Sequence, residues 1–200
     1  PLNAFSSVGL RGKKSNVWEG GHRVPGIFRW PGKIEAGTQC DVPVCGVDYL
    51  PTVCEIAEID VPQDRVLDGV SLLPLLNGQA TSLQRERPLY WFFYRLNPSL
   101  AIRDGKWSLI SNTNDSQRPK THALIAEDML KIQSSRPESF QLYDLSTDLQ
   151  QQHDVGESHP NVLRAMQDRS RSMHREVMLD GVRWEIPESY GQGKQRKIWE

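Results

Sequence analysis

Cysteine and long apolar runs are both scarce in this sequence. Three cysteines occur in 200 residues, and none belongs to a Cys-x-x-Cys pair or has a histidine at zinc-finger spacing, which excludes a structural zinc site of that kind. The longest apolar run near the start, residues 24–30, is far shorter than the roughly 20 residues that a membrane-spanning helix needs. The formal net charge is only −1, so no overall field attracts nucleic acid or an anionic membrane. We therefore expect neither as a partner.

Several catalytic motifs are missing as well. The sequence has no Gly-x-Ser-x-Gly elbow, no Walker loop and no His-Glu-x-x-His helix, so the usual signatures of serine hydrolases, P-loop enzymes and zinc proteases are absent. Asp144, Asp148 and Asp154 are loosely spaced after a strand-like segment, which is more typical of a solvated turn than of a calcium site. We expect no metal site within these residues.

The three cysteines, Cys40, Cys45 and Cys54, leave two interpretations open. We expect them to be small buried hydrophobes with free thiols. The alternative is a disulfide between Cys40 and Cys45 in an oxidising compartment.

The sequence is unusually rich in glycine and basic side chains between Gly9 and Pro25. These 17 residues contain four glycines, four basic residues, one glutamate, one histidine and one tryptophan. Each glycine inside a helix costs roughly 0.5–1 kcal/mol relative to alanine, which argues against a helix. A solvated linker would not carry a tryptophan or run into an apolar segment. We therefore expect an ordered cationic loop, of the kind that binds anions on a rigid scaffold.

Within this stretch, each charged or titratable side chain has two interpretations. Lys13 and Lys14 either place ammonium groups around an oxyanion or form a solvated surface pair. Glu19 either orients Arg23 for function or clamps the loop through a carboxylate–guanidinium contact, and we favour the clamp. His22 is either an acid or base near neutral pH or a supporting residue beside Arg23.

Hydrophobic periodicity and turn residues predict the secondary structure. We expect a strand over 24–30 and a helix within 44–59 that begins near Asp48 as its N-cap. Further along, the expected elements are strands over 89–95, 100–103, 106–111 and 140–145, with a tight turn at 104–105 and a short helix over 123–132. The last expected element is a helix opened by Pro160, whose buried stripe is Val162, Leu163, Met166 and Met173.

These elements indicate an α/β fold in two parts. Residues 1–84 form the end of a larger α/β domain, because one strand and one helix cannot close a core by themselves. Residues 85–180 form a small antiparallel sheet packed by a helix, and residues 181–200 form a polar tail. The aromatic run 90–94 either packs in the core and between domains or lines a sugar-binding groove.

Several ordered motifs resemble the type I sulfatases, which are formylglycine-dependent enzymes of the alkaline-phosphatase-like superfamily and include arylsulfatases and N-acetylgalactosamine-6-sulfatase. The resemblance runs from about residue 9 to 175. Its main motif, Leu10-Arg11-Gly12-x-Lys14 with Trp18-Glu19-Gly20-Gly21-x-Arg23-Val24-Pro25, is similar to the lysine loop of that family. The remaining matches are Asp48–Thr52, Leu67–Leu72, Arg87–Trp91, Ala101–Trp107 and Leu142–Leu145.

The resemblance implies a role for each position of the loop. Lys14 stands where the family places a lysine that contacts the substrate sulfate, so it is expected in catalysis and in substrate binding. His22 is a further candidate for substrate binding, at a position where the family varies. Glu19, Gly20, Gly21 and Arg23 match positions that shape the loop.

The family's reaction centre has no counterpart in these residues. The resemblance implies a calcium ion and a formylglycine made from Cys or Ser in a C/S-x-P-S/T-R motif, and neither that motif nor the family's Asp-Asp and Asp-Asn pairs occurs here. We therefore interpret the chain, whose first residue is Pro1, as the C-terminal part of a sulfatase that is inactive in isolation. The nucleophile and metal ligands are expected upstream, on an N-terminal sulfatase domain.

The resemblance favours a periplasmic, secreted or lysosomal compartment, and a sulfated small molecule or sulfated glycan as substrate. Two alternatives remain open at this point. One is a phosphonate or phosphodiester hydrolase of the same superfamily, and the other is a non-catalytic carbohydrate-binding module.

Overall fold

The computed structural model describes residues 9–94, 99–114 and 126–181. They divide into two compact units. The first, called the sheet unit below, is the described part of residues 1–23 and 90–200, and the second, called the helical unit, is residues 24–89. The polar tail expected over 181–200 lies almost wholly outside the described residues.

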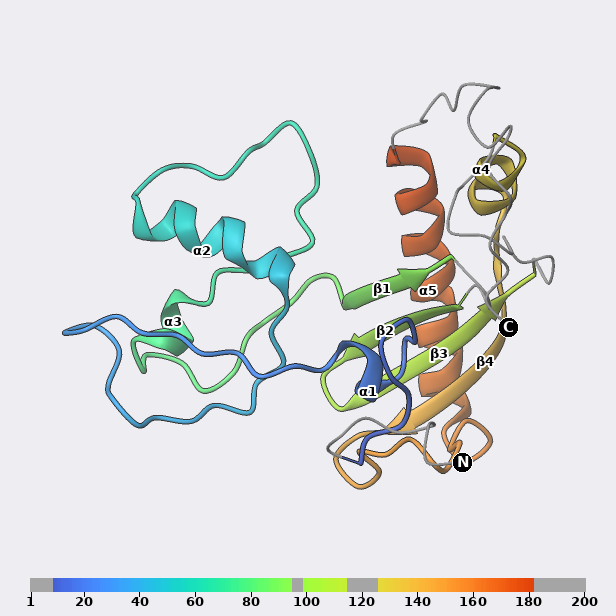
Figure 1. Ribbon diagram of the computed structural model, residues 1–200, viewed down its shortest axis with the longest axis horizontal. Coiled ribbons are helices and arrows are strands. Elements are labelled where there is room, and N and C mark those ends of the chain that lie inside the picture. Colours follow the sequence, from blue (N-terminus) through green and yellow to red (C-terminus); the bar gives the residue numbers. More distant parts are fainter. Residues whose placement is uncertain (1–8, 95–98, 115–125, 182–200) are drawn as a thin grey trace, which may run out of the picture. The chain divides into compact units, whose positions relative to one another are not determined.

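A four-stranded sheet in the order β1-β2-β3-β4 organises the sheet unit (Figure 1). The strands are β1 (Leu89–Phe93), β2 (Ser99–Asp104), β3 (Trp107–Thr113) and β4 (Pro137–Asp144). Strands β2, β3 and β4 pair antiparallel. The expected tight turn is confirmed, since Gly105 has a positive φ of 55° between β2 and β3, a conformation that glycine adopts at little cost.

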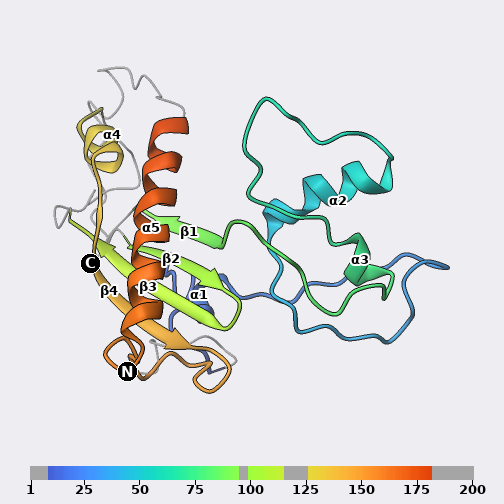
Figure 2. The same cartoon turned by 180° about the vertical axis from the view of Figure 1, so that it is seen from behind.

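The two faces of the sheet bury different partners because side chains alternate along a strand. On one face, Ile102, Leu109 and Leu142 pack against Met166 and Met173 of helix α5 (Pro160–Asp180). Figure 2 shows α5 lying across this face. The helix and its buried methionines are those expected from the sequence.

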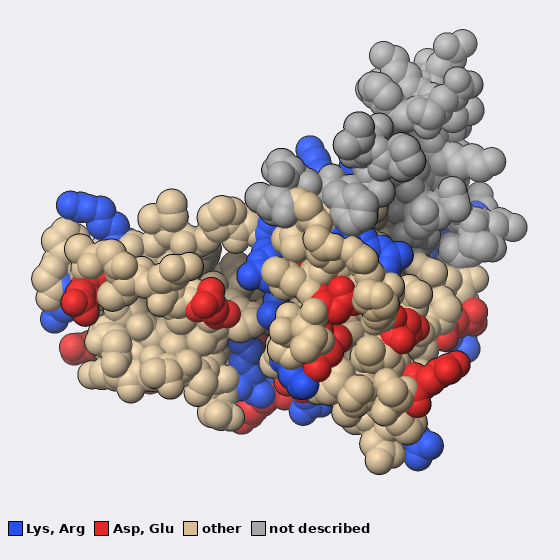
Figure 3. All heavy atoms as spheres, turned by 90° about the horizontal axis from the view of Figure 1, so that it is seen from below, with Lys and Arg blue, Asp and Glu red and all other residues tan. Residues whose placement is uncertain are grey.

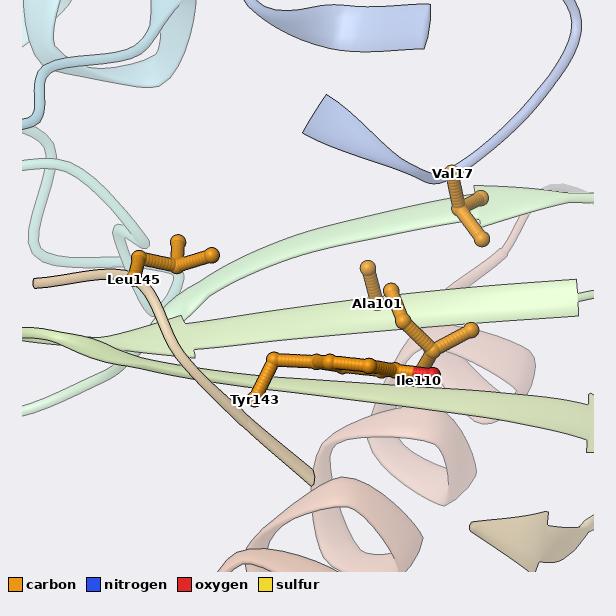
Figure 4. Packing of buried hydrophobic residues seen from close by; sticks show 5 residues of the cluster. All are labelled: Val17, Ala101, Ile110, Tyr143 and Leu145. Carbon is orange, nitrogen blue, oxygen red and sulfur yellow. The ribbon is translucent and has the colours of Figure 1, made fainter. Parts of the chain in front are cut away.

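The opposite face packs against the N-terminal segment of the chain. Ala101, Ile110 and Tyr143 form a buried cluster with Val17 and Leu145 (Figure 4). The short helix α1 (Glu19–His22) belongs to this N-terminal segment. A second short helix, α4 (Ala126–Gln133), precedes β4.

The helical unit contains a 3-10 helix η1 (Gly46–Asp48), helix α2 (Tyr49–Ile56) and helix α3 (Leu73–Leu76). Asp48 is the N-cap of α2, as expected, although its carboxylate accepts hydrogen bonds from the backbone N–H groups of Cys45 (2.8 Å) and Val70 (3.0 Å). The Nη1 and Nη2 groups of Arg85 each donate a hydrogen bond to the same carboxylate, both at 2.7 Å. Burial by itself would raise the pKa of Asp48, but the hydrogen bonds from Arg85 and from the two backbone N–H groups together outweigh it, so the pKa is lowered.

The strand expected over residues 24–30 is not formed. Val24 is 78% and Ile27 is 90% exposed. An apolar run becomes a strand only beside a partner strand, and Pro25 has no N–H to donate to one. The prediction of a strand from the apolar run alone is therefore wrong.

All three cysteines are free, but they are not all buried as expected. Only Cys54 is buried, while Cys45 is half-buried and Cys40 is exposed. The alternative disulfide is likewise not formed.

Acidic and basic side chains both occur over the described residues of the face in Figure 3, in keeping with the small net charge. Among the described residues, none of the helices is long and apolar enough to span a bilayer.

Candidate functional site

Residues 9–23, called the lysine loop below, are folded onto the sheet rather than extended in solvent. Val17 is 3% exposed and packs in the cluster of Ala101 and Ile110. The Arg11 guanidinium stacks on the Trp18 ring at 3.6 Å from its centroid, and Trp18 meets Tyr143 edge-on. The expectation of an ordered loop is thus confirmed, and its order comes from strands more than 70 residues later in the chain.

The carboxylate of Glu19 lies at the centre of this arrangement and is 1% exposed. Arg103 Nη1 lies 3.3 Å and Arg23 Nη1 3.3 Å from its Oε2 atom. His22 Nε2 lies 3.9 Å from Oε1. Charge compensation by two guanidinium groups is what allows a carboxylate to be buried this completely. The ion pair expected between Glu19 and Arg23 is present, with Arg103 as a third member, and its role as a clamp on the loop stays a prediction.

Gln151 connects the loop to the sheet through both its side chain and its backbone. The Glu19 N–H donates to Gln151 Oε1 (2.8 Å), and Gln151 Nε2 donates to Ser108 Oγ (3.0 Å). Arg11 Nη1 donates to the Gln151 carbonyl at 2.7 Å. Gln151 is fully buried, so each of these bonds is shielded from competition by water.

Gly20 and Gly21 lie where the backbone passes close to an earlier part of the same loop, which leaves no room for a Cβ atom. A Cβ on Gly20 would lie 2.6 Å from the carbonyl oxygens of Arg11 and Gly12. A Cβ on Gly21 would lie 2.1 Å from the carbonyl oxygen of Asn16. Contacts this short are far inside van der Waals distance, so any larger residue would push the loop open.

Lys13 and Lys14 lie on an exposed turn that the rest of the loop holds in place. Asn16 N–H donates to the Lys13 carbonyl (2.9 Å), and Asn16 Oδ1 accepts from Lys13 N–H (3.0 Å). Ser15 has a φ of 76° at the tip of this turn. Within the described part of the chain, neither ammonium group has an ion-pair partner. Lys14 therefore presents an uncompensated positive charge from a fixed backbone.

The His22 side chain packs against strand β1 rather than lying on the exposed turn. Its ring stacks on Trp91 with centroids 4.1 Å apart and planes 9° apart, and its side chain is 12% exposed. Burial lowers the pKa of His22, although the Glu19 carboxylate opposes the effect. The ring is thus neutral at pH 7 and helps to fill the space around Glu19. Its expected role in substrate binding stays a prediction.

Arg103 and Gln151 contribute to the site although sequence reasoning did not single them out. For Arg103 there was a faint signal, because it is two residues from Ala101 and so shares its face of β2. For Gln151 no sequence signal exists, since an isolated glutamine in a polar segment normally lies in solvent. The described residues also contain no cluster of three or more His, Cys, Asp or Glu side chains that could hold a metal ion.

The aromatic residues of β1 are used in packing within the sheet unit. Trp91 and Phe93 pack on the Val17 cluster, while Phe92 contacts the ring of His174 on the opposite face. This arrangement matches the expectation of core packing.

Comparison with known proteins supports the resemblance noted in the sequence. Human steryl-sulfatase is 46% identical over 84 residues, which are 42% of this chain and 14% of that protein. The N-acetylgalactosamine-6-O-sulfatase of Bacteroides thetaiotaomicron is 29% identical over 168 residues, or 84% of this chain and 30% of that protein. The chain thus spans less than a third of the length of either relative.

Structural comparison agrees with these matches. A solved protein of the glycosaminoglycan metabolism of Bacteroides thetaiotaomicron superposes with a TM-score of 0.60 at 26% identity, covering 82% of this chain and 32% of that chain. The antiparallel sheet with its packing helix is therefore the C-terminal portion of a sulfatase fold, as expected.

A family model described as N-sulphoglucosamine sulphohydrolase, C-terminal, matches residues 12–129, which is more than half of the chain. This match includes most of the lysine loop and the first three strands of the sheet. The chain belongs to this family of sulfatase C-terminal domains.

Proposed function

We propose that the lysine loop binds the sulfate group of a substrate through Lys14, as part of a sulfatase whose nucleophile and metal ligands lie outside this chain. The observation that carries the proposal is the contrast within the loop. Glu19 is buried and held by two arginines, while Lys14 is exposed on a turn whose backbone is fixed. A rigid support with one projecting cation is what a sulfate oxygen requires for binding in a defined position.

Calcium and formylglycine do not fit the residues of this chain. Its described part holds no metal-binding cluster, and none of the three cysteines lies in a C/S-x-P-S/T-R motif. Both groups would therefore have to come from another part of the protein.

Lys14 would act as a compact point charge toward the sulfate oxygens. In sulfate ester hydrolysis the S–O bond to the leaving group breaks, and negative charge grows on the oxygens and on the leaving group. A positioned ammonium group in a partly desolvated site stabilises such charge without reorganising. Removing one donor of this kind costs roughly 2.7–4 kcal/mol of transition-state stabilisation, or about 10²–10³ in turnover.

For the substrate we propose a sulfated sugar. The relative that matches 84% of this chain is an N-acetylgalactosamine-6-O-sulfatase, whereas the match to steryl-sulfatase covers 42%. A match of 168 residues in a chain of 200 necessarily includes β4 and the start of α5.

Turnover of a 4-nitrophenyl sulfate by the gene product that contains this chain tests the proposal. We expect Lys14→Ala to lower kcat/KM by about 10²–10³, and Lys13→Ala, one position away on the same turn, to have a much smaller effect. Near-normal turnover of the Lys14→Ala protein would contradict the role. Faster hydrolysis of the diester bis(4-nitrophenyl) phosphate than of the sulfate would favour the phosphodiester or phosphonate alternative.

A second test uses the 200-residue chain by itself. We expect it to hydrolyse no sulfate ester and to bind calcium only weakly. Measurable turnover by the purified chain would show that the reacting groups are present within it.

A further inference from the structure

A cleft lies in the sheet unit between residues 133–138 and the C-terminal turns of α5, with a volume of about 580 Å³. Figures 1 and 2 both show α4 beside this half of α5. Helix α5 covers the face of the sheet opposite the lysine loop. The volume falls within the range of roughly 300–1,000 Å³ that is usual for small-molecule sites.

Three arginines and one glutamate line the cleft: Arg136, Arg171, Arg175 and Glu138. Arg136 and Arg175 are exposed, and within the described ranges neither guanidinium group has an ion-pair partner. Arg171 Nη1 lies 3.5 Å from Asp168 Oδ1, and the Arg171 guanidinium group stacks over the Phe140 ring. Two uncompensated guanidinium groups are therefore available, and their planar forks suit the paired oxygens of a sulfate or carboxylate.

One of the lining residues, His174, is buried and hydrogen-bonded on both ring nitrogens. His174 is 2% exposed, its Nδ1 atom is 2.8 Å from Tyr90 Oη, and its Nε2 atom is 3.1 Å from the Ser135 carbonyl oxygen. Since a carbonyl oxygen only accepts, Nε2 carries the proton and Nδ1 accepts from the tyrosine. Burial lowers the pKa of His174, so this ring adds no charge to the cleft.

The remaining wall is apolar. Pro137, Met178 and Leu179 line the cleft, and Leu179 is 72% exposed beside the arginines. Apolar side chains next to cations suit a ligand that has both a ring face and an acidic group. The only aromatic ring among the described lining residues is that of His174, which is 2% exposed, so no ring face is open for stacking on a nucleobase.

We propose that this cleft binds an acidic saccharide, with Arg136 and Arg175 contacting its sulfate or carboxylate groups and the Pro137–Leu179 wall contacting a sugar ring. The choice of a sugar rests on the proposed function, whereas the choice of an anion rests on the arginines.

Fluorescence anisotropy with a labelled heparin tetrasaccharide tests this proposal, using the Lys14→Ala form of the gene product so that the lysine turn does not dominate binding. We expect Arg175→Ala and Arg136→Ala each to raise Kd about tenfold, the usual effect of losing a hydrogen bond to a charged group. Glu138→Gln should lower Kd, because it removes the one acidic side chain among the lining residues. The matched control is Arg164→Ala, since Arg164 is also exposed on α5 but is not among the cleft residues.

Hydrogen exchange of the same complexes should show protection over 133–138 and 171–179. A tetrasaccharide without sulfates distinguishes carboxylate from sulfate recognition. Equal losses of affinity for Arg175→Ala and Arg164→Ala, the absence of binding, or stronger protection by an oligonucleotide of equal charge would each overturn the proposal. The proposed function fails separately, through unchanged turnover of the Lys14→Ala protein.

Discussion

Glu19 and Arg103 are 84 residues apart in the sequence and meet in the interior, with Arg103 Nη1 3.3 Å from Glu19 Oε2. Arg103 comes from β2, so the pair ties the lysine loop to the middle of the sheet. Its side chain is 16% exposed and that of Glu19 is 1% exposed. Replacing Glu19 leaves Arg103 without its ion-pair partner, and replacing Arg103 leaves the Glu19 carboxylate with Arg23 as its only arginine.

We expect Glu19→Gln to destabilise the protein by about 3–5 kcal/mol, the usual cost of breaking a buried ion pair from one side. The free energy of unfolding from urea titration measures this change. The control is Glu157→Gln, which replaces an exposed carboxylate in the same unit. If both variants unfold at the same urea concentration, Glu19 does not clamp the loop.

Gly21→Ala should displace the loop while leaving the sheet folded. The new Cβ would lie 2.1 Å from the Asn16 carbonyl oxygen, so the backbone next to the Lys14 turn must move. We expect faster amide exchange over residues 12–21 and a loss of sulfate ester turnover. Gly46→Ala is the matched control, because a Cβ there meets nothing within 4 Å. Unchanged amide exchange in Gly21→Ala would show that the backbones at Gly21 and Asn16 leave room for a Cβ atom.

Arg85→Ala should destabilise the helical unit. It leaves the Asp48 carboxylate, which is fully buried, with only the two backbone N–H donors, at a cost of about 3–5 kcal/mol. Arg85→Lys should fall between this variant and the wild type, since lysine keeps the charge but cannot donate two bonds in a fork. Chemical denaturation followed by circular dichroism provides the measurement.

The control for Arg85 is Arg65→Ala, which breaks a fully exposed pair with Asp64. We expect no measurable change in stability there, because exposed pairs contribute little.

The Asp48 carboxylate also predicts a pH dependence of the protein's stability. Its pKa is lowered on folding from 3.8, so its contribution to stability is present above about pH 4 and is lost as the pH falls further.

His174 should make the protein less stable in mild acid. Burial lowers its pKa from 6.5 in the folded state, so the unfolded chain takes up a proton first as the pH falls through that value. Stability is therefore full above about pH 7 and declines below pH 6.5. His22 shifts in the same direction and adds to the decline.

Comparing wild type with His174→Gln at pH 7.5 and pH 5.5 measures the His174 contribution. The variant should be less stable at pH 7.5, because it loses the Tyr90 and Ser135 bonds, but should lose less stability on acidification. His153→Gln serves as control, since that side chain is 79% exposed. An equal pH dependence in wild type and His174→Gln would exclude this residue as the source.

The elements that could be predicted from sequence are those fixed by local chemistry. The Asp104-Gly105 turn, the Pro160 helix start and its methionine stripe all depend on residues close to one another in the chain. The strand predicted over residues 24–30 is not formed, because a strand needs a partner strand that no local pattern encodes. Gln151 and Arg103 were missed for a related reason, since their roles depend on a fold that joins positions 84 and 132 residues from Glu19.

The same long-range dependence explains what remains unpredicted in the site. The lysine loop had recognisable residues, but its support comes from β2, β3 and the segment after β4. The division into residues 1–84, 85–180 and 181–200 stays a prediction. It places the loop with the first part, whereas the contacts described above join it to the sheet.

The way Gln151 holds the loop has a consequence for recombining sulfatase domains. The loop contacts described above involve residues of the sheet unit. A chimera that replaces only residues 24–89 therefore keeps the contacts that hold the Lys14 turn in place. A breakpoint between Arg103 and Gln151 would separate a group that binds the Glu19 carboxylate from the group that binds its backbone N–H. Transplanting the turn of Lys14 into another enzyme therefore requires the sheet to move with it.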